Sequence, residues 1–243
     1  MKIIKLDTVV STNSFLKDLS VSAALENFTV VVTQKQTKGR GQQKNEWLSE
    51  PHKNLTFSVF TSLKDVKIIH KKYLNFAISL AIYRVLFDKN TPKISIKWPN
   101  DLMAANKKIC GILIENTFFG DQIKSTIIGI GLNVNQEKFP ASLRNVTSLK
   151  LATLKETDLN ALLHEILAEL QSNLKLLESK DFHLLEEQYL NVLYKKNIPT
   201  MFKTSKDEIF MGIISGISDQ GNLQIQLEDD SIKEFGIKEV SML

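Results

Sequence analysis

The hydrophobic pattern of this 243-residue chain changes once, at Pro199. Before Pro199, β-branched and alternating stretches are interleaved with long segments of helical periodicity, which is typical of an α/β or α+β domain. After it, only short alternating stretches remain, separated by turn residues, which is typical of a small β-barrel. We therefore predict a mixed β-sheet flanked by helices over residues 1–196 and a β module over residues 197–243.

The elements of these two parts follow from periodicity and from capping residues. Continuous β-branched runs predict buried strands, and Ser, Thr or Asp before a periodic segment predicts the start of a helix. Strands are expected at residues 3–6, 29–33, 55–62, 94–98, 108–119 and 125–135. Helices are expected at residues 13–19, 65–87, 157–178 and 182–194, with Ser11 or Thr12, Asp65 and Thr157 as N-caps. Turns are expected at residues 120–121, 206–207, 220–222 and 229–230.

Composition narrows the class of partner and the compartment. The formal charge of +4 and the pI of about 8.9 are too small an excess to argue for nucleic acid, and they suit an anionic small molecule or an acidic partner. The single cysteine, Cys110, excludes an intrachain disulfide and fits a reducing compartment. The first residues do not resemble a signal peptide, and no apolar stretch reaches about 18 residues. We expect a cytoplasmic protein without a membrane span.

The first candidate site is a stretch rich in glycine and basic residues, "QKQTKGRGQQKNEW" (residues 34–47). Two glycines flank Arg40, so backbone N–H groups can approach a ligand while the guanidinium offers a planar fork to phosphate or carboxylate. The spacings of the Walker A motif and of the dinucleotide fingerprint are absent. Taken alone, this stretch is better explained as a solvated basic loop.

The second candidate is "ISIKWPNDLM" (residues 94–103), an alternating strand that stops at Pro99. Proline removes a backbone donor and fixes φ, so Asn100 and Asp101 should lie on a tight corner at a strand end, where ligands often bind. Lys108 begins the next apolar stretch. Lys97, Lys108 and one carboxylate on adjacent strand ends would make an anion clamp. An edge strand whose lysine extends to water explains Lys97 but not the sharp end.

The third candidate is "IGIGLNVN" (residues 128–135), in which Gly129 and Gly131 alternate within a strand and share one face with Asn133. A strand face without side chains often accommodates another backbone or a flat ligand. A bulge or close strand packing explains the glycines equally well.

In their order and spacing, these stretches together resemble the biotin protein ligases, also named biotin–[acetyl-CoA-carboxylase] ligases. The resemblance covers nearly the whole chain and implies an SH3-like form for the C-terminal barrel. The motifs that carry it are "STN" (11–13), "GRGQ" (39–42), "KWPND" (97–101), "KICGILIE" (108–115), "GIGLNVN" (129–135) and "GISDQGNL" (216–223).

Members of this family make biotinyl-5′-AMP and pyrophosphate from biotin and ATP, and then pass biotin to one lysine of a biotin carboxyl carrier domain. The resemblance therefore implies biotin and ATP as substrates, with Mg²⁺. Around biotin it places Ser11, Thr12, Asn13, Gln36, Gly39, Arg40, Gly41, Gln42, Lys108, Gly111, Gly129 and Gly131. Around ATP it places Arg40, Trp47, Lys97, Asn100, Lys108 and Asn133, with Trp47 and Asn133 at the adenine. The implied catalytic residues are Arg40, Lys97, Lys108 and Asp101.

The chemistry of this reaction agrees with those positions. The carboxylate of biotin must attack the α-phosphorus of ATP, anion against anion, so Arg40, Lys97 and Lys108 would neutralise charge together with Mg²⁺. In the second step the acceptor lysine must lose a proton. Asp101 is the candidate to orient or deprotonate that amine, and it is also the candidate Mg²⁺ ligand.

Two positions depart from the pattern of the family. Gln42 and Lys44 stand where many relatives have arginine and glycine, which bears on how tightly a closed loop retains the adenylate. Cys110 stands where a small residue is usual, and we interpret it as a buried small hydrophobe rather than a reactive thiol.

Three other functions compete with biotin ligation. A lipoate or octanoate ligase or transferase shares the fold and the adenylate chemistry. A transcriptional repressor needs a DNA-binding domain, and we expect no DNA binding because only a few residues precede the first strand. A non-catalytic module that binds a carrier leaves the three stretches unexplained. A homodimer that pairs residues 125–135 as an edge strand is left open.

Overall fold

The computed structural model describes residues 1–42 and 45–243, and its larger part is built on one mixed β-sheet. The strands of this sheet are β1 (Lys2–Val9), β2 (Thr29–Gln36), β3 (Leu55–Ser62), β4 (Ser95–Lys97), β5 (Asp101–Ala104), β6 (Lys107–Phe119) and β7 (Gln122–Leu132). Their order is β1-β2-β3-β7-β6-β5-β4. β1 and β2 pair in parallel, and the other neighbours pair antiparallel.

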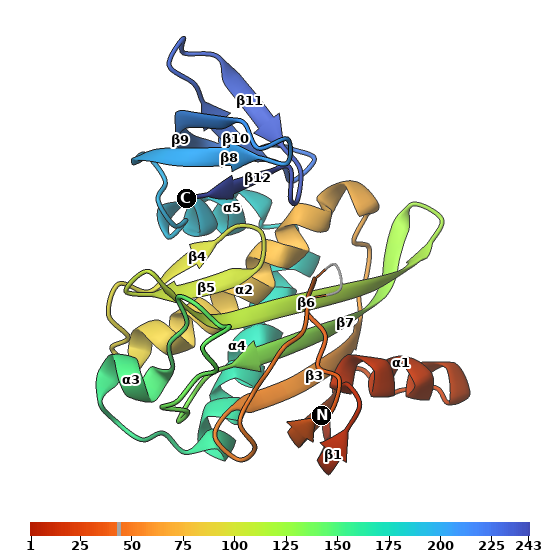
Figure 1. The fold of residues 1–243 in the computed structure, drawn as a ribbon. Coiled ribbons are helices and arrows are strands. Elements are labelled where there is room, and N and C mark those ends of the chain that lie inside the picture. Colours follow the sequence, from red (N-terminus) through yellow and green to blue (C-terminus); the bar gives the residue numbers. More distant parts are fainter. Residues whose placement is uncertain (43–44) are drawn as a thin grey trace.

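Different helices cover the two faces of this sheet. The helices are α1 (Thr12–Ser22), α2 (Lys71–Asp88), α3 (Leu149–Thr153), α4 (Leu159–Glu178) and α5 (Phe182–Asn191), with a 3₁₀ turn at Ile68–His70. Successive β7 residues point to opposite faces: Ile127 packs in a small cluster with Leu16 of α1, whereas Ile128 belongs to the large core that includes residues of α2 and α4. Figure 1 shows α2 and α4 behind the sheet, with α5 next to the C-terminal module. The face toward α1 is thus free to hold a site.

Two predicted helix caps are wrong. Asp65 lies at φ 54° outside any helix, and α2 begins only at Lys71, after the 3₁₀ turn. Asp158, not Thr157, caps α4, and its carboxylate accepts a 2.7 Å hydrogen bond from the Ala161 N–H. A carboxylate one residue later reaches the free N–H groups of the first turn, so the helix starts there. The cap of α1 is Ser11, one of the two predicted residues.

Sheet order bears on the edge-strand pairing that the sequence left open. β7 lies between β3 and β6, so residues 125–135 do not provide an open edge for pairing with a second copy. The edge strands of this sheet are β1 and β4, and Ile96 of β4 is hydrogen-bonded to the backbone of Val192 and Tyr194. The short elements β5 and α3 were not predicted, because four or five residues are too few for a clear period.

Among the described helices, none has both the length and the apolar character needed to cross a bilayer.

The C-terminal module is a five-stranded antiparallel sheet that lies beyond α5 in Figure 1. Its strands are β8 (Pro199–Thr204), β9 (Ile209–Ile217), β10 (Leu223–Gln226), β11 (Ile232–Phe235) and β12 (Val240–Met242), in the order β11-β10-β9-β8-β12. The three predicted turns join β8 to β9, β9 to β10 and β10 to β11. The domain boundary between residues 196 and 197 stays a prediction.

Two polar contacts join this module to the larger part. The buried ammonium of Lys72 on α2 lies 2.9 Å from Glu186 and 3.2 Å from Asp219 in the β9–β10 turn. In the same turn, the Gly221 carbonyl accepts a 3.0 Å hydrogen bond from Trp98 Nε1. Trp98 directly follows Lys97, so the module is bonded to the corner that the sequence marked as a site.

Candidate active site

A pocket of about 480 Å³ lies over β6 and β7, on the sheet face that also carries α1. It is walled by the start of α1, residues 40–42 and 45–47, the 97–101 corner and the C-terminal module. Of the predicted residues, those that line it are Ser11, Thr12, Asn13, Gln36, Arg40, Gly41, Gln42, Trp47, Lys97, Asn100, Asp101, Lys108, Gly111, Gly129 and Gly131. Gly39 and Asn133 do not line it.

One end of the pocket is lined by uncharged polar side chains, next to the ion pair of Arg40 and Glu115. Because Ser11 caps α1, the first turn of this helix brings Thr12 and Asn13 to the pocket wall. Gln36 Oε1 accepts hydrogen bonds from the Thr12 N–H at 2.8 Å and from its hydroxyl at 3.2 Å. Ser58 Oγ lies 2.7 Å from Thr12 Oγ1 and 2.5 Å from Asn13 Oδ1. These buried groups form one connected network, which fixes the orientation of each side chain.

The glycines of β7 make room for side chains from elsewhere in the chain. A Cβ at Gly129 would lie 2.2 Å from Asn13 Oδ1, so only glycine lets α1 approach this strand so closely. Gly131 faces Gly111 across the β6–β7 pair. A Cβ at Gly131 would lie 2.3 Å from Cε2 of the Trp47 indole. The predicted shelf therefore exists, and in this structure it carries Trp47.

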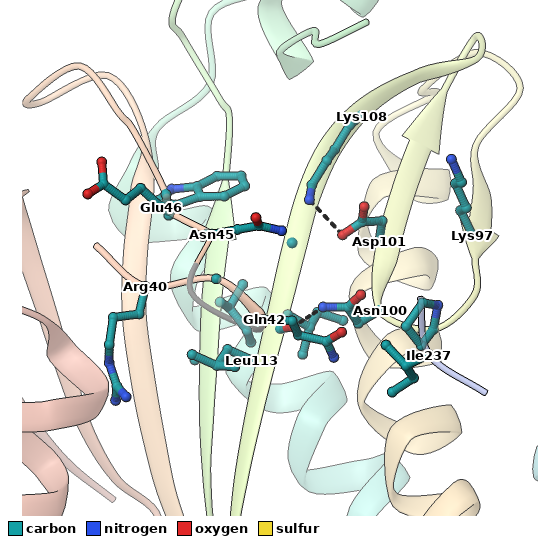
Figure 2. Close-up of a pocket in the computed structure, with 18 of the residues that line it drawn as sticks. Arg40, Gln42, Asn45, Glu46, Lys97, Asn100, Asp101, Lys108, Leu113 and Ile237 are labelled. Atoms are coloured by element: carbon teal, nitrogen blue, oxygen red, sulfur yellow. Dashed lines mark hydrogen bonds and ion pairs between the residues drawn. The ribbon is translucent and has the colours of Figure 1, made fainter. Parts of the chain in front are cut away.

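Lys108 and Asp101 form the opposite, charged end of the pocket. The Lys108 ammonium lies 2.7 Å from Asp101 Oδ1, and Asp101 faces Lys97 across the β4–β5 pair. Figure 2 shows Lys108 and Lys97 on either side of the Asp101 carboxylate. Burial lowers the pKa of the Lys97 ammonium, and Lys108 and Lys195 lower it further, while Asp101 acts in the opposite direction. This end of the pocket thus concentrates positive charge in a partly desolvated place.

Three neighbouring elements hold the 97–101 corner in place. Asn75 of α2 donates to the Pro99 carbonyl at 2.5 Å, and the Trp98–Pro99 peptide bond is cis. Asn100 Nδ2 donates to the Ile112 carbonyl at 2.5 Å, and the Ile112 N–H donates back to the Asn100 carbonyl at 3.0 Å. With the Trp98–Gly221 bond, the corner is fixed by α2, by β6 and by the C-terminal module.

Arg40 points away from the charged end of the pocket (Figure 2). Its guanidinium makes a bidentate pair with Glu115 on β6, at 3.2 Å to Oε1 and 2.8 Å to Oε2. For Arg40 to touch phosphates, as predicted, it would have to exchange this partner. The Trp47 N–H donates to the Gly39 carbonyl at 3.0 Å, so Trp47 lies beside Gly39. The predicted departure at Lys44 lies outside the described residues.

Asn133 is buried and directly follows β7, two residues beyond Gly131. Its Nδ2 donates to the Thr147 carbonyl at 3.0 Å, whereas its Oδ1 is buried and has no hydrogen-bond partner among the described residues. A buried unpaired acceptor is rare in proteins and fits a site completed by a ligand donor. Its role at the adenine stays a prediction.

Comparison with known proteins decides the family. Residues 6–133 match the Biotin/lipoate A/B protein ligase family, and residues 199–242 match the Biotin protein ligase C terminal domain. The chain belongs to the biotin protein ligase family. The Bifunctional ligase/repressor BirA of Bacillus spizizenii is 30% identical over 241 residues, which cover 96% of this chain and 70% of that protein. The Biotin–[acetyl-CoA-carboxylase] ligase of Mycobacterium tuberculosis is 29% identical over 180 residues, which cover 70% of this chain and 64% of that protein.

Solved structures agree with this family and fold. The biotin protein ligase from Aquifex aeolicus in complex with biotin and ATP superposes with a TM-score of 0.80 at 28% identity, covering 100% of this chain and 98% of that one. The chain thus has the mixed sheet with flanking helices and the C-terminal antiparallel sheet of a biotin protein ligase.

Sequence reasoning missed several residues of this biotin protein ligase site. Glu115 ends the "KICGILIE" motif, but nothing local indicates that it contacts Arg40 and Asn13, which are 75 and 102 residues away. The C-terminal module also lines the pocket, through Phe202, Leu223, Ile237, Lys238, Val240, Ser241 and Met242. Cys110 is fully buried, as predicted, and burial raises the pKa of its thiol, so it remains an unreactive hydrophobic residue.

Proposed function

We propose that this chain is an ATP-dependent biotin protein ligase. It joins biotin to ATP, forming biotinyl-5′-AMP and releasing pyrophosphate, and then transfers biotin to one lysine of a biotin carboxyl carrier domain, such as that of acetyl-CoA carboxylase. The lipoate or octanoate ligase is the weaker alternative, because the Mycobacterium tuberculosis relative and the Aquifex aeolicus structure are named for biotin.

The two chemically different ends of one pocket carry this proposal. The Ser11–Thr12–Asn13 end offers neutral hydrogen-bonding groups in a dry environment, which suits the uncharged ureido ring of biotin. The Lys97–Lys108 end offers cations, which suit the biotin carboxylate and the phosphates of ATP. Lipoate and octanoate have an apolar tail end and would leave the buried polar groups of the first end without partners.

Adenylation at the charged end is chiefly a matter of position and charge. A carboxylate oxygen of biotin forms a bond to the α-phosphorus while the bond from that phosphorus to the pyrophosphate oxygen breaks. Lys108 lies within the pocket beside Trp47, where its ammonium would meet these anions. Lys97 adds a second cation whose partial burial strengthens its field. The indole of Trp47 closes one wall against water, which protects a labile anhydride.

Magnesium fits this site as an ion carried mainly by the nucleotide. Among the described residues, no group of three or more His, Cys, Asp or Glu side chains is placed to hold a metal ion. Mg²⁺ keeps several waters and commonly takes one or two carboxylates together with substrate phosphates, so Asp101 beside the pocket is a sufficient protein ligand. When bound, the ion would reduce the negative charge of the phosphates.

Transfer to the carrier needs a neutral lysine amine near the adenylate. The free amine has a pKa of about 10.4, so a carboxylate that orients it or accepts its proton speeds the attack. We assign this role to Asp101, which Lys108 holds at the pocket rim. Cys110 is buried and free of any disulfide, which agrees with a reducing cytoplasm, where we place the reaction.

ATP–pyrophosphate exchange with biotin, lipoate and octanoate offered separately tests the proposal. Stimulation by biotin alone is expected. Stimulation by lipoate or octanoate instead would assign the chain to the alternative, and exchange with none of the three acids by folded protein would contradict a ligase function.

A further inference from the structure

We propose that Glu115 is a positioning residue that fixes the biotin-facing amide of Asn13 and fastens the Arg40 segment to the same end of the pocket. This inference rests on the proposed biotin ligase function. Glu115 does not itself line the pocket, whereas both of its partners do. It therefore acts on the ligand only through them.

The position of Glu115 follows from strand register. On β6, residues 111, 113 and 115 alternate onto the pocket face, opposite Gly131, Gly129 and Ile127 of β7. Glu115 is thus two strand steps beyond the Gly111–Gly131 shelf, next to the start of α1. Its Oε2 accepts a 2.7 Å hydrogen bond from Asn13 Nδ2 and a 2.8 Å hydrogen bond from the Arg40 guanidinium. Its Oε1 accepts a 3.2 Å hydrogen bond from the same guanidinium.

The carboxylate determines which way the Asn13 amide faces. An ionised carboxylate can only accept hydrogen bonds, so it selects the NH₂ group of Asn13. The second N–H of that group lies 3.3 Å from the Leu113 carbonyl. Both N–H groups of the Asn13 amide are thereby bonded to β6. Asn13 therefore presents only an acceptor, its Oδ1, toward the pocket, and this oxygen also accepts a 2.5 Å hydrogen bond from Ser58 Oγ. Such an acceptor matches a ureido N–H of biotin.

Burial distinguishes this arrangement from an ordinary surface ion pair. Asn13 is only 3% exposed, so an amide turned the wrong way would leave buried groups unpaired. The side chains of Arg40 and Glu115 are 42% and 28% exposed, so water screens part of their attraction. The bidentate geometry of the pair restores part of this attraction. It also orders the residues on both sides of Arg40. One carboxylate thus links the amide that recognises biotin to the segment beside it.

The dissociation rate of biotin, measured without ATP, tests this inference. Labelled biotin is bound and then chased with an excess of unlabelled biotin. Glu115→Gln keeps the shape but adds an NH₂ group that can face Asn13 and removes the charge that holds Arg40. We expect biotin to leave about 10-fold faster, the size of one charge-assisted hydrogen bond. Asp121→Asn, which removes an exposed carboxylate and its ion pair with Lys67 from the tip of the same β6–β7 hairpin, is the matched control and should leave the rate unchanged.

A double-mutant cycle with Arg40→Gln separates positioning from simple loss of stability. Because both changes break the same pair, the double variant should release biotin within about 2-fold of the faster single variant. If Glu115→Gln fails to fold, Glu115→Asp, which keeps the charge but shortens its reach to Asn13 and Arg40, should accelerate release, and a wild-type rate in this variant would overturn the inference. Wild-type release rates in folded Glu115→Gln, or effects of the two changes that simply multiply, would overturn the inference. Wild-type protein that binds no biotin would instead overturn the proposed function, and the inference with it.

Discussion

Lys108 and Asp101 form a 2.7 Å ion pair between β5 and β6, at the rim of a pocket whose other end is lined by uncharged polar side chains. The pair holds a carboxylate and an ammonium side by side at the charged end of the pocket. In the proposed mechanism the ammonium would meet the reacting anions of the first step, and the carboxylate would orient the acceptor amine of the second.

Replacing Asp101 with asparagine should separate the two half-reactions. Asparagine cannot accept the proton of the acceptor amine, so we expect transfer from preformed biotinyl-5′-AMP to a carrier domain to slow about 100-fold. Adenylation, measured by pyrophosphate release at saturating Mg²⁺, should fall much less. Equal losses in both steps, or a loss of adenylation that high Mg²⁺ restores, would assign Asp101 to the metal instead.

Lys97 should give adenylation a pH limit. Because burial lowers its pKa, this ammonium loses its proton at lower pH than an exposed lysine, and the rate of adenylation should decline as the pH rises through that value. Lys97→Arg keeps a charge that does not titrate, so in this variant the decline of the adenylation rate on the alkaline side of the pH profile should move to higher pH. Lys97→Met should lose about 100-fold in adenylation at every pH while retaining biotin binding. Matching alkaline limbs in wild type and Lys97→Arg would show that another group sets the limit.

The shelf under Trp47 should not tolerate a side chain. A Cβ at Gly131 would lie 2.3 Å from the indole, so Gly131→Ala must displace Trp47. We expect a changed tryptophan emission spectrum and a KM for ATP raised about 10-fold, the loss of about 1.4 kcal/mol of binding. Gly216→Ala is the control, since the nearest atom to its Cβ would be the flexible end of Gln224 at 3.2 Å. Unchanged emission in Gly131→Ala would contradict the placement of Trp47.

Lys72 should stabilise the junction of α2, α5 and the C-terminal module mainly through Glu186. Burial by itself would lower the pKa of Lys72, but the bonds to Glu186 and Asp219 raise it, so the ammonium stays charged. Lys72→Met should lower the free energy of unfolding by about 1–2 kcal/mol in urea titrations, because Glu186 loses a charged partner. Asp219→Asn should cost less than about 1 kcal/mol, since this carboxylate is 96% exposed. The reverse ranking would contradict this account.

Periodicity predicted the main strands, the long helices and the change of character at Pro199, because these features repeat within a single element. Its errors lie at helix starts and in short elements. Asp65 has the residue type of a cap but takes a left-handed φ of 54°, and the helix starts six residues later at Lys71. Capping depends on backbone geometry that the residue type alone does not specify.

The sequence by itself determined the family, the two-part architecture and most residues of the pocket, since motifs and alternation are local properties of the chain. Only the tertiary structure decided the partners: Glu115 with Arg40 and Asn13, Trp47 on the Gly111–Gly131 shelf, and Trp98 with Gly221. These contacts depend on strand register and on the docking of the C-terminal module. A register slip of one residue would turn Glu115 to the other face of the sheet, and no local pattern records that choice.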